Sequence, residues 1–592
     1  MTVKHLLLSV MLLLFSISTT YAQDTTTSIQ LDENSVTITS AGSYEINGTL
    51  SDGQIIVNTE DDGVVNLILN NVTIHSSTNA PIYVMNAEDV VITLPEGTQN
   101  FVSDGATYDT EDPNAAIYSE SDMTITGGGS LTVEANYNDG IASKDSLTIT
   151  GGNITVTSVD DGIRGKDDLT ISNATITLDV QGDGLKSDNE EDAEKGYIAL
   201  ESSNINITAA NDGIQAETSI TINSGEFNIV TGGGSNAYLG EDVSAKGIKG
   251  AVSVTINGGT FVIDSADDAI HSNDSIVINA GDFLISTGDD GVHADTNLEI
   301  NNGTFNITQS YEGLESAVIT INDGTIYVVS SDDGINVAGG NDGSGMVMGG
   351  GGRGGGGMGG GRGGMPGGNT PPDGNTAPGG NTAPAAPDNA NGQFTPPDNA
   401  GMPSDDWAAG GGFTASGSYY LYINGGYIIV NANGDGLDAN GSIEMTGGIV
   451  LVSGPTENMN GALDYDGSFT LTGGFFVAVG SSGMAQAPGN TSTQASMLVN
   501  FSSNMQPGNL IHIENAQGED ILTFAPIKNY QSISFSSPEL TVGETYNIYV
   551  GGSSTGTATD NLYQGGDYTP GSLYTSLTLS SVVTRLGGGG GR

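Results

Sequence analysis

Short segments of alternating hydrophobic and polar residues follow one another along most of the chain, separated by Gly, Asn and Asp. The stretch from Leu147 to Val156 is representative, with two alternating segments on either side of Gly151-Gly152. Alternation with a period of two predicts half-buried strands, and closely spaced turn residues predict short ones. No long amphipathic helical pattern occurs in the sequence. The pattern therefore predicts an all-β fold.

A second regularity is a recurring phrase, Asp-Gly followed by Ile, Leu or Val. Its copies and degenerate copies begin at Asp139, Asp161, Asp183, Asp212, Lys246, Asp268, Asp290, Glu312, Asp333 and Asp435, mostly 22 residues apart. A fixed period of this length is typical of a solenoid, because one repeat cannot bury its apolar side without neighbours. With about three short strands per repeat, the sequence predicts a right-handed single-stranded parallel β-helix of about 22 residues per rung.

Changes in this pattern divide the chain into seven parts. Residues 1–22 have the charged start, apolar run and small-residue end of a secretory signal peptide, so we expect an exported protein, secreted or periplasmic, without membrane insertion. Residues 23–118 are expected to form N-terminal capping strands and the first rungs, 119–338 the regular rungs, 418–480 the last rungs and 481–586 a C-terminal β cap. The Gly-, Met-, Pro- and Asn-rich segment 339–417 is expected to be a disordered insert, and 587–592 a flexible tail.

Four phenylalanines fall at one register of successive repeats: Phe227, Phe261, Phe283 and Phe305. Rungs of a parallel sheet lie about 4.8 Å apart, so these rings can stack on one another. The alternation of the segments places them toward the core rather than on a sugar-stacking surface.

The amino-acid composition restricts the classes of ligand that the protein can bind. The 592 residues include 13 Lys and Arg against 70 Asp and Glu, for a net charge of −57. So few basic residues argue against nucleic acid, whereas the acid excess favours divalent cations and neutral or metal-bridged ligands. The absence of Cys excludes disulfides and thiolate metal sites. We expect a monomer.

Stacking the repeats turns the acids into two columns on either side of a short strand. Two carboxylates about 5 Å apart repel each other by about 3 kcal/mol at an effective dielectric constant of 20, so cations between them are favoured. Asp-Gly is also ordinary turn chemistry, with Gly supplying a positive φ, but this does not explain the doubled acids. The candidate Ca²⁺ ligands are Asp139, Asp160, Asp161, Asp183, Asp188, Asp212, Asp267, Asp268, Asp289, Asp290 and Asp295.

The residue after each Ile, Leu or Val of the phrase is expected to point outward, since side chains alternate along a strand. Five of these positions are basic or imidazole groups, which we take as candidate ligand-binding residues: Arg164, Lys186, Lys249, His271 and His293. They either neutralise the neighbouring acids or form, with Ca²⁺, a stripe that receives an extended polymer such as a polysaccharide. A zinc or copper site on His271 and His293 is the less favoured alternative.

Several stretches resemble the secreted bacterial carbohydrate-binding-domain family. They are 266–272, 288–295 and 311–316, with 114–118 and 51–55 earlier in the chain, and a Gly- and Met-rich interruption is also similar. The resemblance implies a pectate-lyase-like, right-handed parallel β-helix that binds calcium at its Asp-Gly-Ile turns and interacts with cellulose or pectin-type polymers. Lys246-Gly247 and Glu312-Gly313 depart from the family's Asp-Gly.

Three functions follow as hypotheses. The first is a secreted, calcium-dependent protein that binds cellulose or acidic, pectin-like plant or algal cell-wall polymers without turning them over. The second is a polyuronate lyase, in which Arg164, Lys186 or Lys249 serves as the base of a calcium-assisted β-elimination. The third is a structural or adhesive surface protein whose columns only stabilise the fold.

Overall fold

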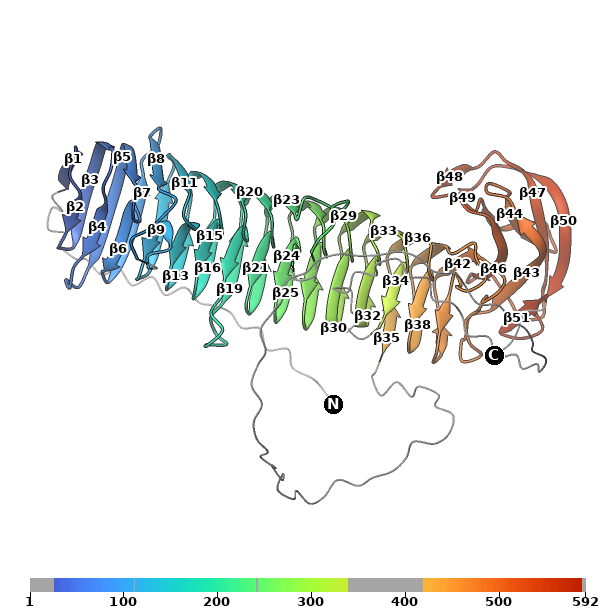
Figure 1. Ribbon diagram of the computed structural model, residues 1–592. Helices are drawn as coiled ribbons and strands as arrows, with labels where there is room; N and C mark the ends of the chain where they lie inside the picture. The colour runs from blue at the N-terminus through green and yellow to red at the C-terminus, as the bar shows by residue number, and fades with distance from the viewer. Residues whose placement is uncertain (1–25, 111, 241–242, 339–418, 588–592) are drawn as a thin grey trace, which may run out of the picture. The chain divides into compact units, whose positions relative to one another are not determined.

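The computed structural model describes residues 26–110, 112–240, 243–338 and 419–587 (Figure 1). These residues are all-β, as predicted, and contain no helix, so none is available to span a membrane. All of them belong to one compact unit. The predicted signal peptide and the predicted insert lie outside the described residues.

Most strands pair in parallel and form three rows, in which each strand is joined to the equivalent strand of the next repeat. The first row carries the Asp-Gly phrase and consists of β2 (Val36–Ile38), β4 (Ile55–Asn58), β6 (Ile82–Asn86), β9 (Ala115–Ser119), β12 (Asp139–Ser143), β15 (Ile163–Gly165), β18 (Leu185–Ser187), β21 (Ile214–Ala216), β24 (Ile248–Gly250), β27 (Ile270–Ser272), β30 (Val292–Ile300), β32 (Leu314–Ile321), β34 (Ile335–Val337), β37 (Leu437–Ala439) and β40 (Asp464–Tyr465).

The second row includes the C-terminal halves of β30 and β32, and its other strands are β1 (Thr27–Leu31), β3 (Gly42–Leu50), β5 (Val64–Ser76), β7 (Asp89–Leu94), β10 (Met123–Gly127), β13 (Ser146–Ile149), β16 (Asp168–Ser172), β19 (Tyr197–Glu201), β22 (Ser219–Ile222), β25 (Ser253–Ile256), β28 (Ser275–Ile278), β35 (Tyr420–Ile423), β38 (Ser442–Met445) and β41 (Phe469–Leu471). The third row begins at the ends of β3 and β5 and continues through β8 (Gln99–Asp104), β11 (Ser130–Ala135), β14 (Asn153–Ser158), β17 (Thr175–Val180), β20 (Ser203–Ala209), β23 (Gly225–Thr231), β26 (Thr260–Ser265), β29 (Asp282–Thr287), β31 (Thr304–Gln309), β33 (Thr325–Ser330), β36 (Tyr427–Ala432), β39 (Ile449–Ser453) and β42 (Phe475–Gly480).

The C-terminal strands pair differently. The last strand of the third row, β42, pairs antiparallel with β46 (Tyr530–Ser536), which is followed by β43 (Ser496–Met505) and β51 (Val583–Leu586). A separate six-stranded sheet has the order β48 (Thr557–Thr559), β49 (Leu562–Gln564), β45 (Asp520–Phe524), β44 (Ile511–Asn515), β47 (Thr545–Ser554) and β50 (Tyr568–Thr578). These strands share an apolar core of their own.

The main core lies between the three rows. The apolar residue of each Asp-Gly phrase is completely buried in it: Ile141, Ile163, Leu185, Ile214, Ile248, Ile270, Val292, Leu314, Ile335 and Leu437. Burying such a side chain stabilises the fold by about 1.5–3 kcal/mol, so the repeat of this phrase fixes the register of the first row.

The four phenylalanines form the predicted ladder inside the core. The ring centroids of Phe227 and Phe261 lie 4.8 Å apart, those of Phe261 and Phe283 4.7 Å, and those of Phe283 and Phe305 4.6 Å, with nearly parallel planes. All four rings are buried. The prediction that they are core residues rather than a sugar platform is therefore confirmed.

An asparagine ladder runs along the outside of the second row. Each side-chain amide donates to the amide oxygen of the preceding repeat over five steps of 2.8–2.9 Å, and its members are Asn223, Asn257, Asn279, Asn301, Asn322 and Asn424. The last step joins residues 102 positions apart. The repeat register therefore continues from β32 to β35 across residues 339–418.

The glycine of the Asp-Gly phrase is required by space and not by a positive φ, contrary to the turn chemistry expected from the sequence. None of the phrase glycines has a left-handed backbone. A Cβ on Gly184 would lie 2.5 Å from the carbonyl oxygen of Gly213 in the next repeat, and one on Gly162 would lie 2.6 Å from that of Gly184. Ala269 takes this place in one repeat, and its N–H still donates to Asp290 O.

We expect Gly184→Ala to lower the free energy of unfolding by about 1–3 kcal/mol, because the added methyl group forces two stacked strands apart. Gly128→Ala is the matched control, since its Cβ meets nothing closer than 3.7 Å and its φ is not positive. Urea unfolding measures both variants. Equal midpoints for the two variants would contradict this explanation of the glycine.

Candidate functional site

The acids that begin the phrases form a column whose members are linked by backbone hydrogen bonds. Oδ1 of Asp139 accepts the N–H of Asp161 at 3.3 Å, Oδ1 of Asp161 accepts that of Asp183 at 2.8 Å, and Oδ1 of Asp183 accepts that of Asp212 at 3.0 Å. The same contact recurs on Asp212, Asp268, Asp290, Asp333 and Asp435. One oxygen of each carboxylate therefore helps to hold the next repeat in place. We call this set the aspartate column.

The second oxygen of these carboxylates faces a row of side chains on the first row of strands, which we call the stripe. Strand register aligns its members directly: Tyr118, Ala142, Arg164, Lys186, Gln215, Lys249, His271, His293, Glu315, Asn336, Asp438 and Asp464. The stripe is basic in its first half, has imidazoles in the middle and becomes acidic toward β40. The kind of ligand that the stripe can bind therefore changes along its length.

In the basic half, the stripe pairs with the aspartate column. Lys186 Nζ lies 2.7 Å from Asp183 Oδ2 and 3.0 Å from Asp161 Oδ2, and Lys249 Nζ lies 2.9 Å from Asp212 Oδ2. Arg164 reaches Asp188 at 2.9 Å and Asp139 at 3.6 Å. These ammonium and guanidinium groups occupy the positions beside the carboxylates that a metal ion would otherwise take.

This pairing argues against Lys186 as the base of a lyase. Burial alone would lower the pKa of Lys186, but the carboxylates of Asp161 and Asp183 outweigh it and raise the pKa above its usual value. The pKa of Arg164 is raised in the same way by Asp188 and Asp139, against the effect of burial. A group held protonated by two carboxylates is a poor proton acceptor.

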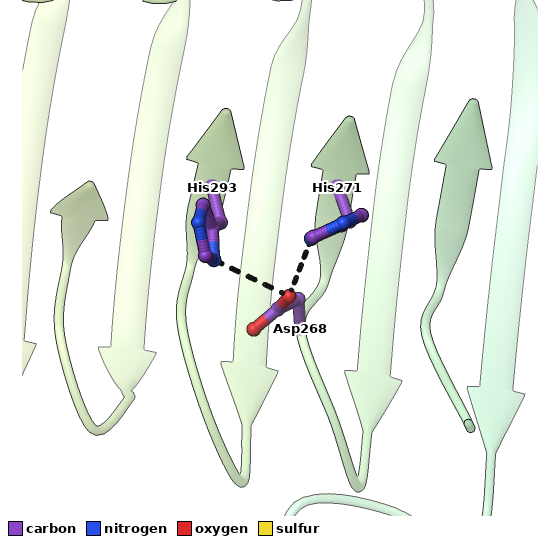
Figure 2. A group of neighbouring side chains, drawn as sticks. All are labelled: Asp268, His271 and His293. Atoms are coloured by element: carbon purple, nitrogen blue, oxygen red, sulfur yellow. Dashed lines mark hydrogen bonds and ion pairs between the residues drawn. The ribbon is translucent and has the colours of Figure 1, made fainter. Parts of the chain in front are cut away.

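In the middle of the stripe, the side chains that alternate outward from their strands are nevertheless buried. His271 is 8% exposed, His293 4% and Glu315 0%. Figure 2 shows the two imidazoles, which project from neighbouring strands toward Asp268. His271 Nδ1 lies 2.8 Å from Asp268 Oδ2 and its Nε2 2.9 Å from Asn273 Oδ1. Being buried, these rings are not placed to receive a polymer lying on the surface.

Lys246, which replaces an aspartate of the column, contacts the acids of the following repeat. Its Nζ lies 2.7 Å from both Asp267 Oδ1 and Asp268 Oδ2. Although burial opposes it, Lys246 and the neighbouring imidazoles hold the pKa of Asp268 below its usual range. Asp289, beside them, has its pKa raised to about 9 by burial and by Asp290 and Asp268.

Two sets of the predicted calcium ligands come together closely enough for one ion, and two further sets contain His271 or His293, one of them with Glu315, which was not among the predicted ligands. Oxygen or nitrogen atoms lie within 4.8 Å of one another in Asp139–Asp160–Asp161, in Asp267–Asp268–Asp289, in Asp268–His271–His293 and in Asp290–His293–Glu315. In the first set, burial and Asp161 raise the pKa of Asp139 to about 8, against the effect of Arg164. Asp183, Asp188 and Asp212 are instead joined to basic side chains, and Asp295 Oδ1 lies 3.5 Å from His293 Nε2.

A fifth set was missed by the sequence analysis. Ligand atoms of Asp333, Asp435 and Asp438 also lie within 4.8 Å of one another, and no ion pair among the described residues joins any of the three to a basic side chain. Burial and neighbouring acids raise the pKa of Asp333 to about 8, that of Asp435 to about 6 and that of Asp438 to about 7. The available signal was the aspartate at 438, which stands at the stripe position where earlier repeats carry Arg, Lys or His.

A surface depression lies at the basic end of the stripe. It has a volume of about 530 Å³ and is lined by Lys144, Arg164 and Lys166, with Tyr118, Glu120 and Asp145 among its other residues. Lys144 is an exposed residue that also pairs with Glu120 at 3.2 Å. Lys166 forms no ion pair with any of the described residues. Of the five ligand-binding residues predicted from the sequence, Arg164 lines this depression.

Comparison with known proteins shows the family. The chain belongs to the carbohydrate-binding domain-containing proteins, whose family profile matches residues 32–291 and 289–334. A carbohydrate-binding domain-containing protein of Acetivibrio thermocellus is 44% identical over 138 residues, which are 22% of this chain. The match spans about half, 48%, of that relative's length. A polysaccharide lyase-like protein from C. thermocellum, solved as a gadolinium derivative, shares 37% identity over 35% of this chain and 91% of its own, with a TM-score of 0.34.

We expect the metal-free protein to become more stable on acidification from about pH 8 to about pH 5. The pKa values of Asp333, Asp435 and Asp438 are raised above the usual value of about 4, so the folded state binds protons more tightly than the unfolded state and loses stability as pH rises through this window. Urea unfolding in the presence of a chelator measures it. The triple variant with Asn at these positions should show a smaller pH dependence than the parent, while Asp139 and Asp289, whose pKa values are also raised, keep their contribution in both proteins. A pH profile unchanged by the three substitutions would contradict the assignment.

Proposed function

We propose that the protein binds polysaccharides in a calcium-dependent manner and recognises acidic, pectin-like cell-wall polymers along the outer face of its first row of strands. Membership of the carbohydrate-binding domain-containing family supports the class of ligand. The observation that carries the choice of an acidic polymer is the depression at Lys144, Arg164 and Lys166, where three basic side chains line one hollow of a chain of net charge −57. Its lining also includes Asp112, Glu120 and Asp145.

The cations of the depression suit uronate sugars. Guanidinium and ammonium groups form charge-assisted hydrogen bonds with carboxylates, and these are about twice as strong as neutral ones. Lys166 has no ion-pair partner within the described ranges and can turn toward a ligand, whereas Lys144 is exposed and pairs with Asp112 at 3.3 Å and with Glu120 at 3.2 Å, pairs that a uronate carboxylate would have to replace. A neutral polymer such as cellulose offers hydroxyls but no carboxylate for these groups, and we rank it second.

The residues of the acidic end fit calcium. Asp333, Asp435 and Asp438 offer only oxygen donors, which Ca²⁺ prefers at about 2.3–2.6 Å, and two ligands on opposite sides of such an ion are up to about 5 Å apart. Their ligand atoms lie within 4.8 Å of one another, and burial together with neighbouring acids raises the pKa of Asp333 and Asp438. Within the described residues, no basic side chain forms an ion pair with them. A bound Ca²⁺ would supply positive charge there. Asp139, Asp160 and Asp161 form a second oxygen set, which we rank below the first because Arg164 and Lys186 already pair with Asp139 and Asp161.

The proposal includes the finer features expected from the sequence. The three rows of parallel strands, with pairings 22 residues apart at several aspartates, support a right-handed parallel β-helix. We further propose export by the signal peptide and action as a monomer. A linear polymer then lies along equivalent positions of successive repeats, so that its repeating sugar units contact equivalent side-chain positions of the protein.

Calcium should raise the stability of the protein in a way that depends on Asp438. At a Ca²⁺ concentration one hundred times the dissociation constant, one site contributes about 2.7 kcal/mol to the free energy of unfolding. In Asp438→Asn, which weakens the fifth set, we expect calorimetric titration to find one calcium ion fewer per chain and a smaller rise in the melting temperature. Asp567→Asn, an exposed residue outside the site, is the control. Equal calcium stoichiometry in both variants would contradict this site.

Binding to polygalacturonate should depend on the depression. We expect the double variant Lys144→Ala/Lys166→Ala to bind about tenfold more weakly, a loss of about 1.4 kcal/mol, while Arg585→Ala, an exposed cation elsewhere, binds like the parent protein. Co-sedimentation with cross-linked polygalacturonate and with cellulose, each with and without chelator, measures retention. Ultraviolet absorbance of the supernatant would reveal unsaturated ends and hence a lyase. No retention on either polymer would contradict the proposed function and favour the structural alternative.

A further inference from the structure

The middle of the stripe contains a mixed nitrogen and oxygen cluster that charge balancing does not explain. In earlier repeats the stripe residue is a cation facing the aspartate column, as with Lys186 and Lys249. At β27 and β30 the sequence has His271 and His293, and at β32 it has Glu315, so a carboxylate stands where the pattern had placed a cation. Glu315 is completely buried. It adds negative charge to a region that already contains Asp290.

The atoms of this cluster are spaced as the ligands of one metal ion are. His293 Nδ1 lies 3.4 Å from Asp290 Oδ2 and 3.5 Å from Glu315 Oε2. Metal–ligand bonds of about 2.0–2.2 Å in a tetrahedral zinc site place neighbouring ligand atoms about 3.3–3.6 Å apart. Both distances fall in this range.

The burial and the hydrogen bonds of Asp290 point to the same conclusion. Its Oδ1 accepts the N–H of Glu312 at 3.1 Å, whereas its Oδ2 is buried and faces His293 Nδ1 at 3.4 Å and the carboxylate of Glu315. Asp290 is 0% exposed, so bulk water does not reach this oxygen. A buried carboxylate oxygen costs several kcal/mol unless a donor or a cation is bound to it.

Two further carboxylates lie next to the cluster. Asp268 Oδ2 lies 3.7 Å from His293 Nδ1 but is closer to Lys246 Nζ and His271 Nδ1, at 2.7 and 2.8 Å, so its main partners lie outside the cluster. Asp295 Oδ1 lies 3.5 Å from Nε2 of His293, the nitrogen on the far side of the ring from Nδ1. A carboxylate behind a ligating imidazole is the common arrangement in zinc proteins, because it orients the ring and makes it more basic.

We propose that Asp290, His293 and Glu315 form a binding site for one divalent metal ion of the zinc class. The donor set selects the metal. Calcium prefers six to eight oxygen ligands, whereas one imidazole with two carboxylates in a compact, buried set suits zinc and its first-row neighbours. This site is separate from the oxygen-only set at Asp333, Asp435 and Asp438 and does not rest on the proposed polysaccharide binding.

The full chain, stripped of metal with a chelator and then dialysed, tests this proposal with Zn²⁺ alone. We expect isothermal titration with Zn²⁺ in millimolar Ca²⁺ to find one tight site per chain, and His293→Gln to weaken it by at least about tenfold. His75→Gln, a histidine of β5 far from this cluster in the sequence, is the matched control and should bind as the parent does. Unchanged Zn²⁺ affinity in His293→Gln, or displacement of Zn²⁺ by calcium, would overturn the proposal.

A second measurement needs no variant and guards against misfolding of His293→Gln. X-ray absorption at the zinc edge of the loaded parent protein should show a first shell of one nitrogen and oxygens at about 2.0–2.1 Å. Substitution of Co²⁺ should give the visible absorption of a low-coordinate cobalt site. A shell of oxygens alone, or of two or more imidazoles, would contradict the assignment to Asp290, His293 and Glu315.

Discussion

The structure depends on a carboxylate that serves two partners at once. In the aspartate column, Oδ1 accepts the backbone N–H of the next repeat, and Oδ2 faces the stripe. Asp183 shows both contacts, with Asp212 N–H at 3.0 Å on one oxygen and Lys186 Nζ at 2.7 Å on the other. Because the amide contact recurs on eight aspartates of the column, the fold itself brings the carboxylates together. Only cations or protons can relieve the resulting repulsion between carboxylates. The stacked carboxylates of this fold therefore require positive charge beside them.

The residue type at the stripe position determines what can neutralise the carboxylate of each repeat. Where it is Lys186 or Lys249, the protein supplies its own cation. Where it is His293 or Asp438, the chain supplies a further ligand in place of a cation, and the site is suited to an ion from solution. One scaffold therefore places basic side chains at one end of the stripe and groups of carboxylates and imidazoles further along, without any change in the backbone, and we propose that the former receive an acidic polymer and the latter metal ions.

The repeat made much of this predictable. The Ile after each Asp-Gly and the Phe227 ladder follow from alternation and period alone, and so does the alignment of the acids. The burial of individual side chains could not be predicted from the sequence. His293 points outward from its strand, yet neighbouring turns bury it, and the period of the repeat does not show which outward side chains the turns cover. The role of Gly184 was misjudged because close approach to the next repeat is a property of stacked strands, which a single turn does not reveal. Asp438 was overlooked because its partner Asp333 lies more than a hundred residues away in the sequence.

The most direct test of the account separates the two roles of Asp183. Asp183→Asn keeps an oxygen that accepts the Asp212 N–H but removes the charge, whereas Asp183→Ala removes both. Urea unfolding of the two variants, each also combined with Lys186→Met, gives the free energies. The account predicts that in the Lys186→Met background Asn is at least as stable as Asp, while Ala is less stable by about 1–3 kcal/mol, the cost of an unsatisfied buried amide. Equal losses for Asn and Ala in that background would show that the hydrogen bond to the next repeat does not hold the column together.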